Sequence, residues 1–311
     1  MAVFPTLQDA PTLYLSVIVP AYNEEKRIPE ERGIDDMIAH LSQLEAADAT
    51  GKCVGLRPPC SSRPLHSSPK LTPSPPPPSH TARAPGSQMA KGWEIIVVDD
   101  GSKDGTAALV VAKYVREQGA ARVRLLKCAA NGGKGAAVRK GMLRARGKWL
   151  LMADADGATD IKALGELLAR GAAVAVRDAS GRQPRAFAVG SRAHLKKARS
   201  ALRQFFSTSF HVVISVLLGG QTIQDTQCGF KLFTRAAARS LFGALHIERW
   251  AFDVELVYLA GLLGVPTVEV PVPWHEVGGS KLDPTSASIE MLRDIIVIRL
   301  AYLAGFWKVA V

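Results

Sequence analysis

The stretch KWLLMADAD, residues 148–156, decides the fold and the chemistry that this sequence predicts. Its first part, Lys148–Met152, is mostly large and apolar, as is typical of a short strand buried on both faces. Asp154 and Asp156 follow where the chain begins to turn, so their carboxylates can point the same way. Mg²⁺ and Mn²⁺ favour such oxygen ligands and keep open positions for phosphate oxygens. Because Asp pairs are also common in turns, the preceding strand gives the pattern its weight.

Four similar apolar runs occur elsewhere, and segments with helical periodicity separate them. Strand, helix and strand in repetition predict right-handed crossovers, a mostly parallel sheet and an α/β fold class. The expected strands are Leu15–Val19, Glu94–Val98, Val123–Leu126, Lys148–Met152 and Ala186–Val189, and the expected helices are Glu24–Glu45, Asp104–Gln118, Gly133–Ala145 and Asp160–Arg170. Ligands of such folds bind outside the carboxyl ends of the strands. Five polar residues are expected there: Asn23, Asp99, Asp100, Asp154 and Asp156.

Two of these strand ends carry motifs with more than one interpretation. Asp99 and Asp100 end one strand, and either could accept hydrogen bonds from a base or a ribose. Alternatively, Asp100 or Ser102 caps the following helix. The segment VPAYNEE ends the first strand, and the ring of Tyr22 could frame a planar base. The alternative is a helix capped by Asn23 with acids in its first turn.

The glycine-rich segment NGGKG, residues 131–135, precedes an expected helix. It does not fit the P-loop pattern, because Cys128 stands in place of the first glycine and Gly135 in place of Ser or Thr. Backbone N–H groups at a glycine-rich helix start can still bind phosphate. A simple tight turn is nearly as good an interpretation.

Composition narrows the class of protein. The 311 residues are 47% hydrophobic and 22% charged, which is ordinary for a globular protein with a core. Four cysteines without C-x-x-C or zinc spacing predict a reducing, cytosol-facing environment. The net charge is +11, but residues 51–92 carry +6 of it. The remaining modest excess, without an aromatic platform, predicts no nucleic-acid partner and suits anionic lipid or phosphate-bearing substrates.

Residues 51–92 interrupt the strand and helix pattern. This segment holds ten of the nineteen prolines, many serines and no acidic residue. Such a composition cannot bury enough apolar surface to offset the entropy of ordering. We expect a disordered, partly polyproline insertion, and a role as an SH3-type ligand is the less favoured alternative. The predicted domains are therefore 13–285, interrupted by 51–92, and a C-terminal amphipathic helix, 286–311.

The C-terminal half predicts helices at Arg199–Leu218, Phe252–Leu263 and Ile289–Trp307, and an edge strand within Val268–Val277 because of its prolines. No apolar run is long enough for a spanning helix. Arg199–Leu218 and Ile289–Trp307 could lie in a membrane interface, with ordinary core helices as the alternative. Any contact with a membrane is thus expected at its surface.

Seven motifs in chain order carry a family resemblance: VPAYNEE, VVDDGSKDGT, NGGKG, ADADGA, GSR, DTQCGFKLF and RWAFDVEL. Together they resemble the family 2 inverting glycosyltransferases, and within that family the dolichyl-phosphate β-glucosyltransferases. The resemblance runs roughly from Leu15 to Trp307, apart from the insertion. It implies a GT-A (Rossmann-like) fold, UDP-glucose as donor and dolichyl phosphate as acceptor. The product would be dolichyl β-D-glucosyl phosphate for N-glycan assembly, made at the cytosolic face of the endoplasmic reticulum membrane.

The resemblance also assigns roles to individual residues. For the donor it implies Pro20, Tyr22, Glu24, Asp99, Asp100, Lys134, Asp154 and Gln227. For the acceptor phosphate it implies Arg192, Arg203 and Ser207, and for Mg²⁺ or Mn²⁺ it implies Asp154 and Asp156. Asp253 falls where many family members place a catalytic base. The family carries an N-terminal membrane anchor that is not visible here, so the expectation is a peripheral protein of unknown oligomeric state.

The acceptor's chemistry modifies the role expected of Asp253. A phosphate monoester has a second pKa of about 6 and is an anion near neutral pH, so it needs no base. We expect Asp253 to orient the sugar or Arg192, while Arg192 offsets the repulsion between two phosphate-bearing substrates. Two other functions stay open: a polyprenyl-phosphate mannosyltransferase that uses GDP-mannose, and a non-catalytic nucleotide-sugar-binding protein.

Overall fold

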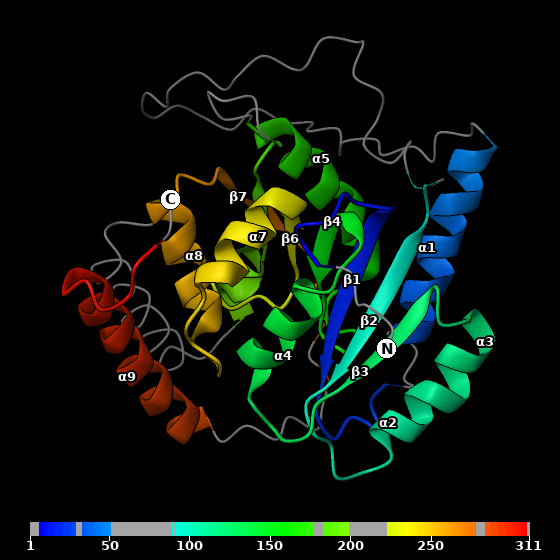
Figure 1. Cartoon of the computed structure of the whole chain (residues 1–311), viewed down its shortest axis with the longest axis horizontal. Coiled ribbons are helices and arrows are strands. Elements are labelled where there is room, and N and C mark those ends of the chain that lie inside the picture. Colours follow the sequence, from blue (N-terminus) through cyan, green and yellow to red (C-terminus); the bar gives the residue numbers. More distant parts are fainter. Residues whose placement is uncertain are drawn as a thin grey trace.

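The computed structural model describes residues 6–28, 33–50, 89, 91–176, 183–198, 223–275, 277 and 284–309. A seven-stranded sheet in the order β3-β2-β1-β4-β6-β5-β7 forms its centre (Figure 1). All neighbouring strands run parallel except β6, which is antiparallel to β4 and β5. The strands are β1 (Leu13–Ala21), β2 (Trp93–Asp99), β3 (Val123–Lys127), β4 (Gly147–Met152), β5 (Phe187–Ser191), β6 (Lys231–Thr234) and β7 (Thr267–Pro271).

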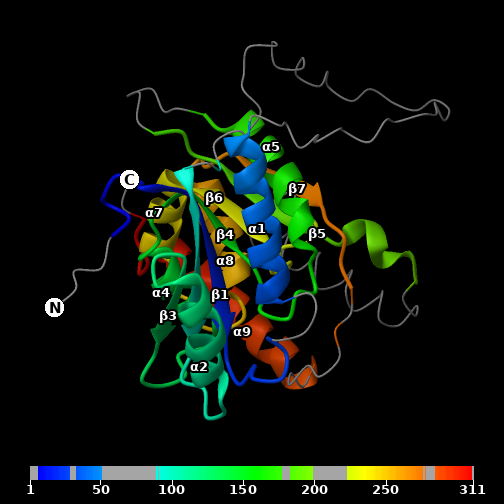
Figure 2. The ribbon, with the colours of Figure 1, turned by 90° about the vertical axis from the view of Figure 1, so that its right-hand side faces the viewer.

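Helices cover both faces of this sheet, as Figures 1 and 2 show. The first face packs on α1 (Ile34–Ala49), on α5 (Leu164–Val174) and on the continuous helical segment α2, η2 and α3 (Thr106–Leu109, Val110–Val115 and Arg116–Gln118). The second face packs on α4 (Lys134–Met142), α7 (Arg235–Ala244) and α8 (Phe252–Leu262). Short 3-10 segments lie at Ile161–Ala163 and Ala193–Ala198.

Alternating side chains of the central strands fill the two cores. In β4, Trp149 and Leu151 belong to the first core, whereas Leu150 and Met152 belong to the second. All four are less than a tenth exposed. A strand that is covered on both faces needs apolar residues at every position, which is why the central strands show little alternation in sequence.

The predicted α/β class and mostly parallel sheet are confirmed, and all five expected strands are present. The edge strand is present as β7, which lies at the end of the sheet. Two elements were not predicted: β6, whose four residues begin with a lysine, and α7 directly after it. The first helix begins only at Ile34, because Glu24–Ile28 forms a hydrogen-bonded turn.

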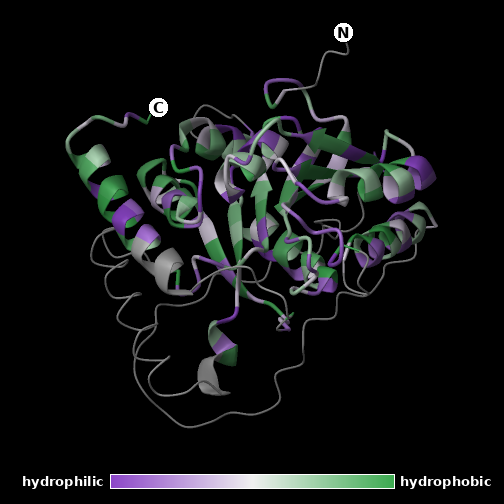
Figure 3. Cartoon of the chain, turned by 90° about the horizontal axis from the view of Figure 1, so that it is seen from below, coloured by the Kyte–Doolittle hydropathy of each residue, from purple (hydrophilic) through white to green (hydrophobic). Residues whose placement is uncertain are grey.

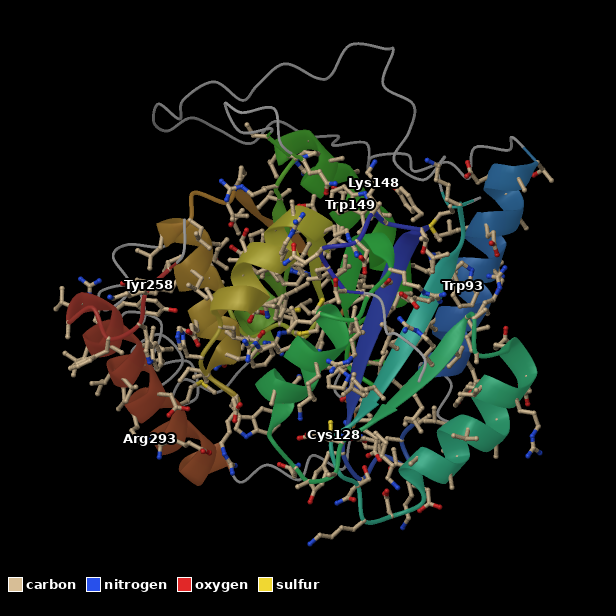
Figure 4. The ribbon with its side chains drawn as sticks, in the orientation of Figure 1. Trp93, Cys128, Lys148, Trp149, Tyr258 and Arg293 are labelled. Atoms are coloured by element: carbon tan, nitrogen blue, oxygen red, sulfur yellow. The ribbon has the colours of Figure 1, made fainter. Side chains whose placement is uncertain are left out.

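Helix α9 (Pro284–Leu303) packs outside the two layers, against α8. Ile295 and Ile298 are fully buried there, and Arg299 donates a hydrogen bond to the hydroxyl of Tyr258, which Figure 4 labels on α8. The end of α9 is anchored by Glu255 of α8, whose carboxylate accepts hydrogen bonds from the Tyr302 hydroxyl and from the backbone N–H of His246.

The opposite side of α9 exposes large apolar side chains. They are Leu292, Ile296, Val297, Leu300 and Leu303, with Phe306 in the following turn. Hydrophobic and hydrophilic residues alternate along this helix in Figure 3, and apolar residues occur on both its buried and its exposed side. In the described part of the chain, no helix has the length and hydropathy to cross a bilayer.

Two predicted segments lie largely outside the described residues. Arg199–Leu218 is one of them. Of the expected insertion, 51–92, the structure describes Met89, Lys91 and Gly92. Met89 is fully buried in the first core, and the Gly92 carbonyl accepts a hydrogen bond from the N–H of Tyr14. The packed chain therefore includes Met89, within the segment expected to be disordered.

Candidate active site

The carboxyl ends of β1, β2, β3 and β4 lie at one edge of the sheet, because these four strands run parallel. Ala21 of β1 pairs with Asp99 of β2, and Ile18 pairs with Met152 of β4. Figure 4 shows this edge near Cys128, which follows β3, and the opposite edge near Lys148 and Trp149. The predicted convergence of the loops after these strands is therefore present in the structure.

Asp154 and Asp156 follow β4 at this edge, and each contacts a cation from a neighbouring loop. Lys134 Nζ lies 2.6 Å from Asp154 Oδ1, and Arg27 Nη2 lies 2.5 Å from Asp156 Oδ2. The second oxygen of Asp156 accepts a hydrogen bond from the N–H of Ala158. Burial disfavours charge on Lys134, but the carboxylates of Asp154 and Asp253 outweigh it and raise its pKa.

These two carboxylates fit a divalent cation that shares its ligands with a substrate. The Asp154 and Asp156 side chains keep about a third and a fifth of their surface exposed, so a ligand can reach them. Among the described residues, no group of three or more His, Cys, Asp or Glu forms a complete metal cage. Hard oxygen donors that are few in number match the preference of Mg²⁺ and Mn²⁺ for additional phosphate and water ligands.

Asp99 and Asp100 have different environments at the end of β2. Asp100 is almost fully buried, and its carboxylate accepts hydrogen bonds from the N–H groups of Gly132 and Gly133. Asp99 accepts one bond from the N–H of Ser102, while its Oδ2 is buried without a partner in the described part of the structure. Asp99 is itself fully buried and keeps one unused acceptor, whereas Asp100 holds the glycine turn.

The loop after β1 is fastened to the loop after β2. Asn23 has a left-handed backbone, with φ of 55°, and its side-chain oxygen accepts a hydrogen bond from the N–H of Lys103. The N–H of Glu24 donates to the Thr106 hydroxyl. Asn23 thus joins two loops and does not cap a helix, which corrects the alternative interpretation. Tyr22 remains 37% exposed at this edge, available to a planar ligand.

The N–H groups of the glycine turn before α4 bond to other groups of the protein. Besides the bonds to Asp100, the N–H of Ala136 donates to the carbonyl of Glu248. A Cβ atom at Gly133 would lie 2.7 Å from that same carbonyl, and one at Gly135 would lie 2.8 Å from the carbonyl of Ile247. These glycines permit a close backbone approach. The tight-turn interpretation therefore explains them better than a phosphate cradle does.

Asp253 lies in the first turn of α8, and its charge acts on Lys134. Its Oδ1 is 2.6 Å from Nζ of Lys231, a lysine with no exposed surface that also donates to the carbonyl of Cys228. Burial raises the pKa of Asp253, and the ammonium groups of Lys231 and Lys134 oppose that shift. A carboxylate already bonded to a buried ammonium group is poorly placed to take a proton from a substrate.

Arg192 follows β5 and forms a bidentate salt bridge with Asp225. Its Nε and Nη2 lie 2.8 and 2.9 Å from the two carboxylate oxygens, and the Trp274 ring centroid is 5.6 Å from its Cζ. Burial disfavours charge on Arg192, but Asp225 outweighs it and raises the pKa of Arg192, with a smaller contribution from Asp154. Trp274 also forms an antiparallel β-bridge with Thr159, a residue of the loop that follows β4 and contains Asp154. The bidentate pair with Asp225 therefore holds the guanidinium in one orientation.

Of the remaining predicted residues, the structure describes Pro20 and Gln227 but not Arg203 and Ser207. The amide nitrogen of Gln227 contacts the sulfur of Met291 on α9. Pro20 lies within β1, opposite Val98. Arg203 and Ser207 fall in residues 199–222, outside the described part.

Three residues of the site were missed from the sequence. Arg27 follows the VPAYNEE motif by two positions, and only its contact with Asp156 identifies it. Gly229 lies inside DTQCGFKLF. A glycine in such a motif is a signal of close packing, and that signal could have identified it. Trp274 follows β7, and only the fold brings it to Arg192.

Comparison with known proteins agrees with this geometry. The sequence model of glycosyl transferase family 2 matches residues 86–242. Dolichyl-phosphate β-glucosyltransferase of Drosophila melanogaster is 42% identical over 99% of this chain and 81% of its own length. The human protein of that name is 40% identical over 98% and 80%, and the Saccharomyces cerevisiae protein 41% identical over 97% and 78%.

Solved structures extend the similarity to the fold. Glucosyl-3-phosphoglycerate synthase of Mycobacterium tuberculosis in complex with Mn²⁺, UDP-glucose and phosphoglyceric acid aligns with a TM-score of 0.51 and 16% identity, over 93% of this chain and 79% of its own. At that identity the alignment shows a shared GT-A-like fold. With relatives about 40% identical over nearly its full length, this chain belongs to the dolichyl-phosphate β-glucosyltransferases of glycosyl transferase family 2.

Proposed function

We propose that this glycosyltransferase moves a glucosyl group from UDP-glucose to dolichyl phosphate, with inversion at the anomeric carbon. The names of its relatives support the sugar and the acceptor. The observation that carries the proposal is the pair Asp154 and Asp156 after the central strand, together with an arginine after β5 that Asp225 holds in place. The product is dolichyl β-D-glucosyl phosphate, a lipid-linked glucose donor for N-glycan assembly.

The donor half of the site supports a nucleoside diphosphate sugar. Asp99 offers its free Oδ2 to the base or the ribose, and Tyr22 offers an exposed ring to the base. Asp154 and Asp156 would hold Mg²⁺ or Mn²⁺, which supplies positive charge against the diphosphate when bound. Lys134 adds a second positive charge at the same place. Cations already positioned at the diphosphate stabilise the negative charge that develops on it as the nucleotide leaves.

The acceptor half of the site supports an anionic nucleophile. Inversion requires attack in line with the departing nucleotide, and two phosphate-bearing substrates repel each other. Arg192 presents a planar guanidinium suited to a phosphate monoester, and its partner Asp225 fixes its orientation. The monoester is already ionised near neutral pH, with its second pKa at about 6. Asp253, bonded to Lys231, orients the site and abstracts no proton.

The membrane half of the proposal rests on α9. A lipid acceptor must be reached from a bilayer surface, and the exposed apolar side of α9 can lie in the interface with Arg293 and Lys308 near lipid headgroups. Figure 4 labels Arg293 near the same edge of the molecule as Cys128. We place the protein peripherally at the cytosolic face of the endoplasmic reticulum membrane.

One assay tests the reaction. Purified protein is incubated with Mn²⁺ or Mg²⁺, a short polyprenyl phosphate, and UDP-glucose, GDP-mannose or UDP-N-acetylglucosamine in separate tubes. We expect a β-linked glucosyl lipid from UDP-glucose, and its loss with EDTA. Arg192→Ala is expected to raise the acceptor KM and lower kcat while UDP affinity stays unchanged. Mannosyl transfer as the main activity, or UDP binding without any transfer, would contradict the proposal.

A further inference from the structure

Arg27 is a cation of the site that no motif assigned. It lies in the turn after β1 and reaches across to the loop after the neighbouring strand β4. Its Nη1 lies 3.2 Å from Glu24 Oε1, and its Nη2 contacts Asp156 Oδ2. Its Nε is buried without a hydrogen-bond partner in the described structure. A buried guanidinium with an unused N–H has room for one more anionic acceptor.

Arg27 and Lys134 contact the two carboxylates in the same way. Each takes one oxygen, of Asp156 and Asp154 respectively, and each side chain is less than a fifth exposed. The carboxylates are the proposed ligands of a divalent cation, which brings two positive charges. A sugar nucleotide's diphosphate brings one negative charge on each phosphate. The two cationic side chains, the two aspartates, the divalent cation and the diphosphate then sum to zero, and Glu24 beside Arg27 adds one negative charge.

We propose that Arg27 is a diphosphate-binding residue, which exchanges Asp156 for a phosphate oxygen of the donor. The inference rests on the proposed function and deepens it. When Asp156 serves a metal ion, Arg27 keeps Glu24 as a partner, but its Nη2 loses its carboxylate and its Nε is already unused. A largely buried guanidinium gains from a new anionic acceptor for these N–H groups. The leaving UDP carries one more negative charge than it has in the donor, so Arg27 also stabilises the departing group.

The proposal predicts opposite effects of one substitution on two ligands. In Arg27→Gln, Asp156 loses a competing cation, so Mn²⁺ alone binds several-fold more tightly, as measured by electron paramagnetic resonance of free Mn²⁺. In the presence of Mn²⁺, UDP binds roughly ten- to a hundredfold more weakly by titration calorimetry, the size of a charge-assisted hydrogen bond. UMP, which lacks the second phosphate, loses less affinity than UDP. Arg27→Lys recovers part of the UDP affinity.

Matched controls separate this inference from the proposed function. Arg170→Gln removes an exposed arginine that pairs with Glu166 on α5, and it leaves both affinities unchanged. Unchanged UDP affinity in a folded Arg27→Gln protein would overturn the inference while leaving the enzyme's function intact. Weaker binding of both Mn²⁺ and UDP would also overturn it, because Arg27 would then only support Asp156. Failure of the wild-type protein to bind UDP would instead refute the proposed function.

Discussion

Gly229 and Asp154 share a space that admits no additional atom. A Cβ atom on Gly229 would lie 1.9 Å from Oδ2 and 2.5 Å from Cγ of Asp154. The two residues come from different segments, the loop before β6 and the loop after β4. Gly229 therefore sets the position of a carboxylate that we propose as a metal ligand.

Replacing Gly229 by Ala is expected to displace the Asp154 carboxylate. Overpacking of this kind costs about 1–3 kcal/mol, and here the displaced group is the proposed ligand. We expect Mn²⁺-dependent UDP affinity to fall at least tenfold, measured by calorimetry. Gly243→Ala on α7 is the matched control, because its Cβ meets nothing within 4 Å. That variant should bind UDP normally and gain roughly 0.5–1 kcal/mol of stability.

The two acids that end β2 should respond differently to amide substitution. Asp99→Asn replaces the unpaired Oδ2 by a donor, so UDP affinity should fall about tenfold or more while the melting temperature changes little. Asp100→Asn removes an acceptor for the backbone of the glycine turn, at a cost of about 1–3 kcal/mol of stability. Calorimetry and thermal unfolding on both variants distinguish the roles. Equal losses of UDP affinity would contradict this assignment.

The ion pair of Asp253 and Lys231 allows a test of our proposal that Asp253 does not act as a general base. Asp253→Asn alone leaves a buried ammonium group unpaired, which costs on the order of 3–5 kcal/mol. The double variant Lys231→Met, Asp253→Asn removes both charges and should fold better than the single variant. We expect it to retain turnover within about tenfold of wild type, with kcat independent of pH above neutrality. A loss of several orders of magnitude that added base recovers would restore Asp253 as the base.

The Arg192–Asp225 pair predicts a pH-dependent contribution to stability. Burial alone would raise the pKa of Asp225, but the Arg192 guanidinium outweighs it and lowers the pKa below the usual 3.8. The folded state therefore gains stability from this group above pH 3.8 and loses it as acid protonates the carboxylate. Asp225→Asn should cost on the order of 3 kcal/mol at pH 7. Urea unfolding should show that difference shrink below pH 4, whereas a constant difference would contradict ionic stabilisation.

The apolar side of α9 predicts binding to lipid. Leu300 and Phe306 are 57% and 84% exposed, so replacing both by Asp should leave the fold intact. Each large apolar side chain contributes up to about 1.5–3 kcal/mol when fully buried, so vesicle binding should weaken more than tenfold. Flotation with phosphatidylserine-containing vesicles measures this effect. Activity toward a short, water-soluble acceptor should be unchanged, and undiminished flotation would remove α9 as the contact surface.

Hydrophobic pattern predicted most of the sheet, because the parallel strands are covered on both faces and show as continuous apolar runs. Strand β6 escaped because its four residues begin with Lys231, whose charge hid a strand position. Only the fold supplies the reason for that lysine, a partner in Asp253. Local sequence gives no hint of a buried charge pair between residues that are distant in the chain.

The site could be predicted only as far as its motifs reach. Asp154 and Asp156 follow a recognisable strand, so their place at the sheet edge was predictable. The difference between Asp99 and Asp100 was not, because it depends on N–H groups from a glycine turn more than thirty residues away. Arg27 was likewise hidden, since a lone arginine in a charged loop resembles any solvated residue until Asp156 is placed beside it.

The segment 246–249 contacts both the start of α4 and the residue Trp307 that follows α9. Its Glu248 carbonyl holds the first turn of α4, whose Lys134 touches Asp154, while the His246 ring stacks on Trp307 at 4.3 Å beyond α9. This short segment of backbone thus connects α9 and the residues after it with the turn that carries Lys134. A change in how that helix is seated, whether by detergent, truncation or a bilayer, should therefore shift Lys134 relative to Asp154.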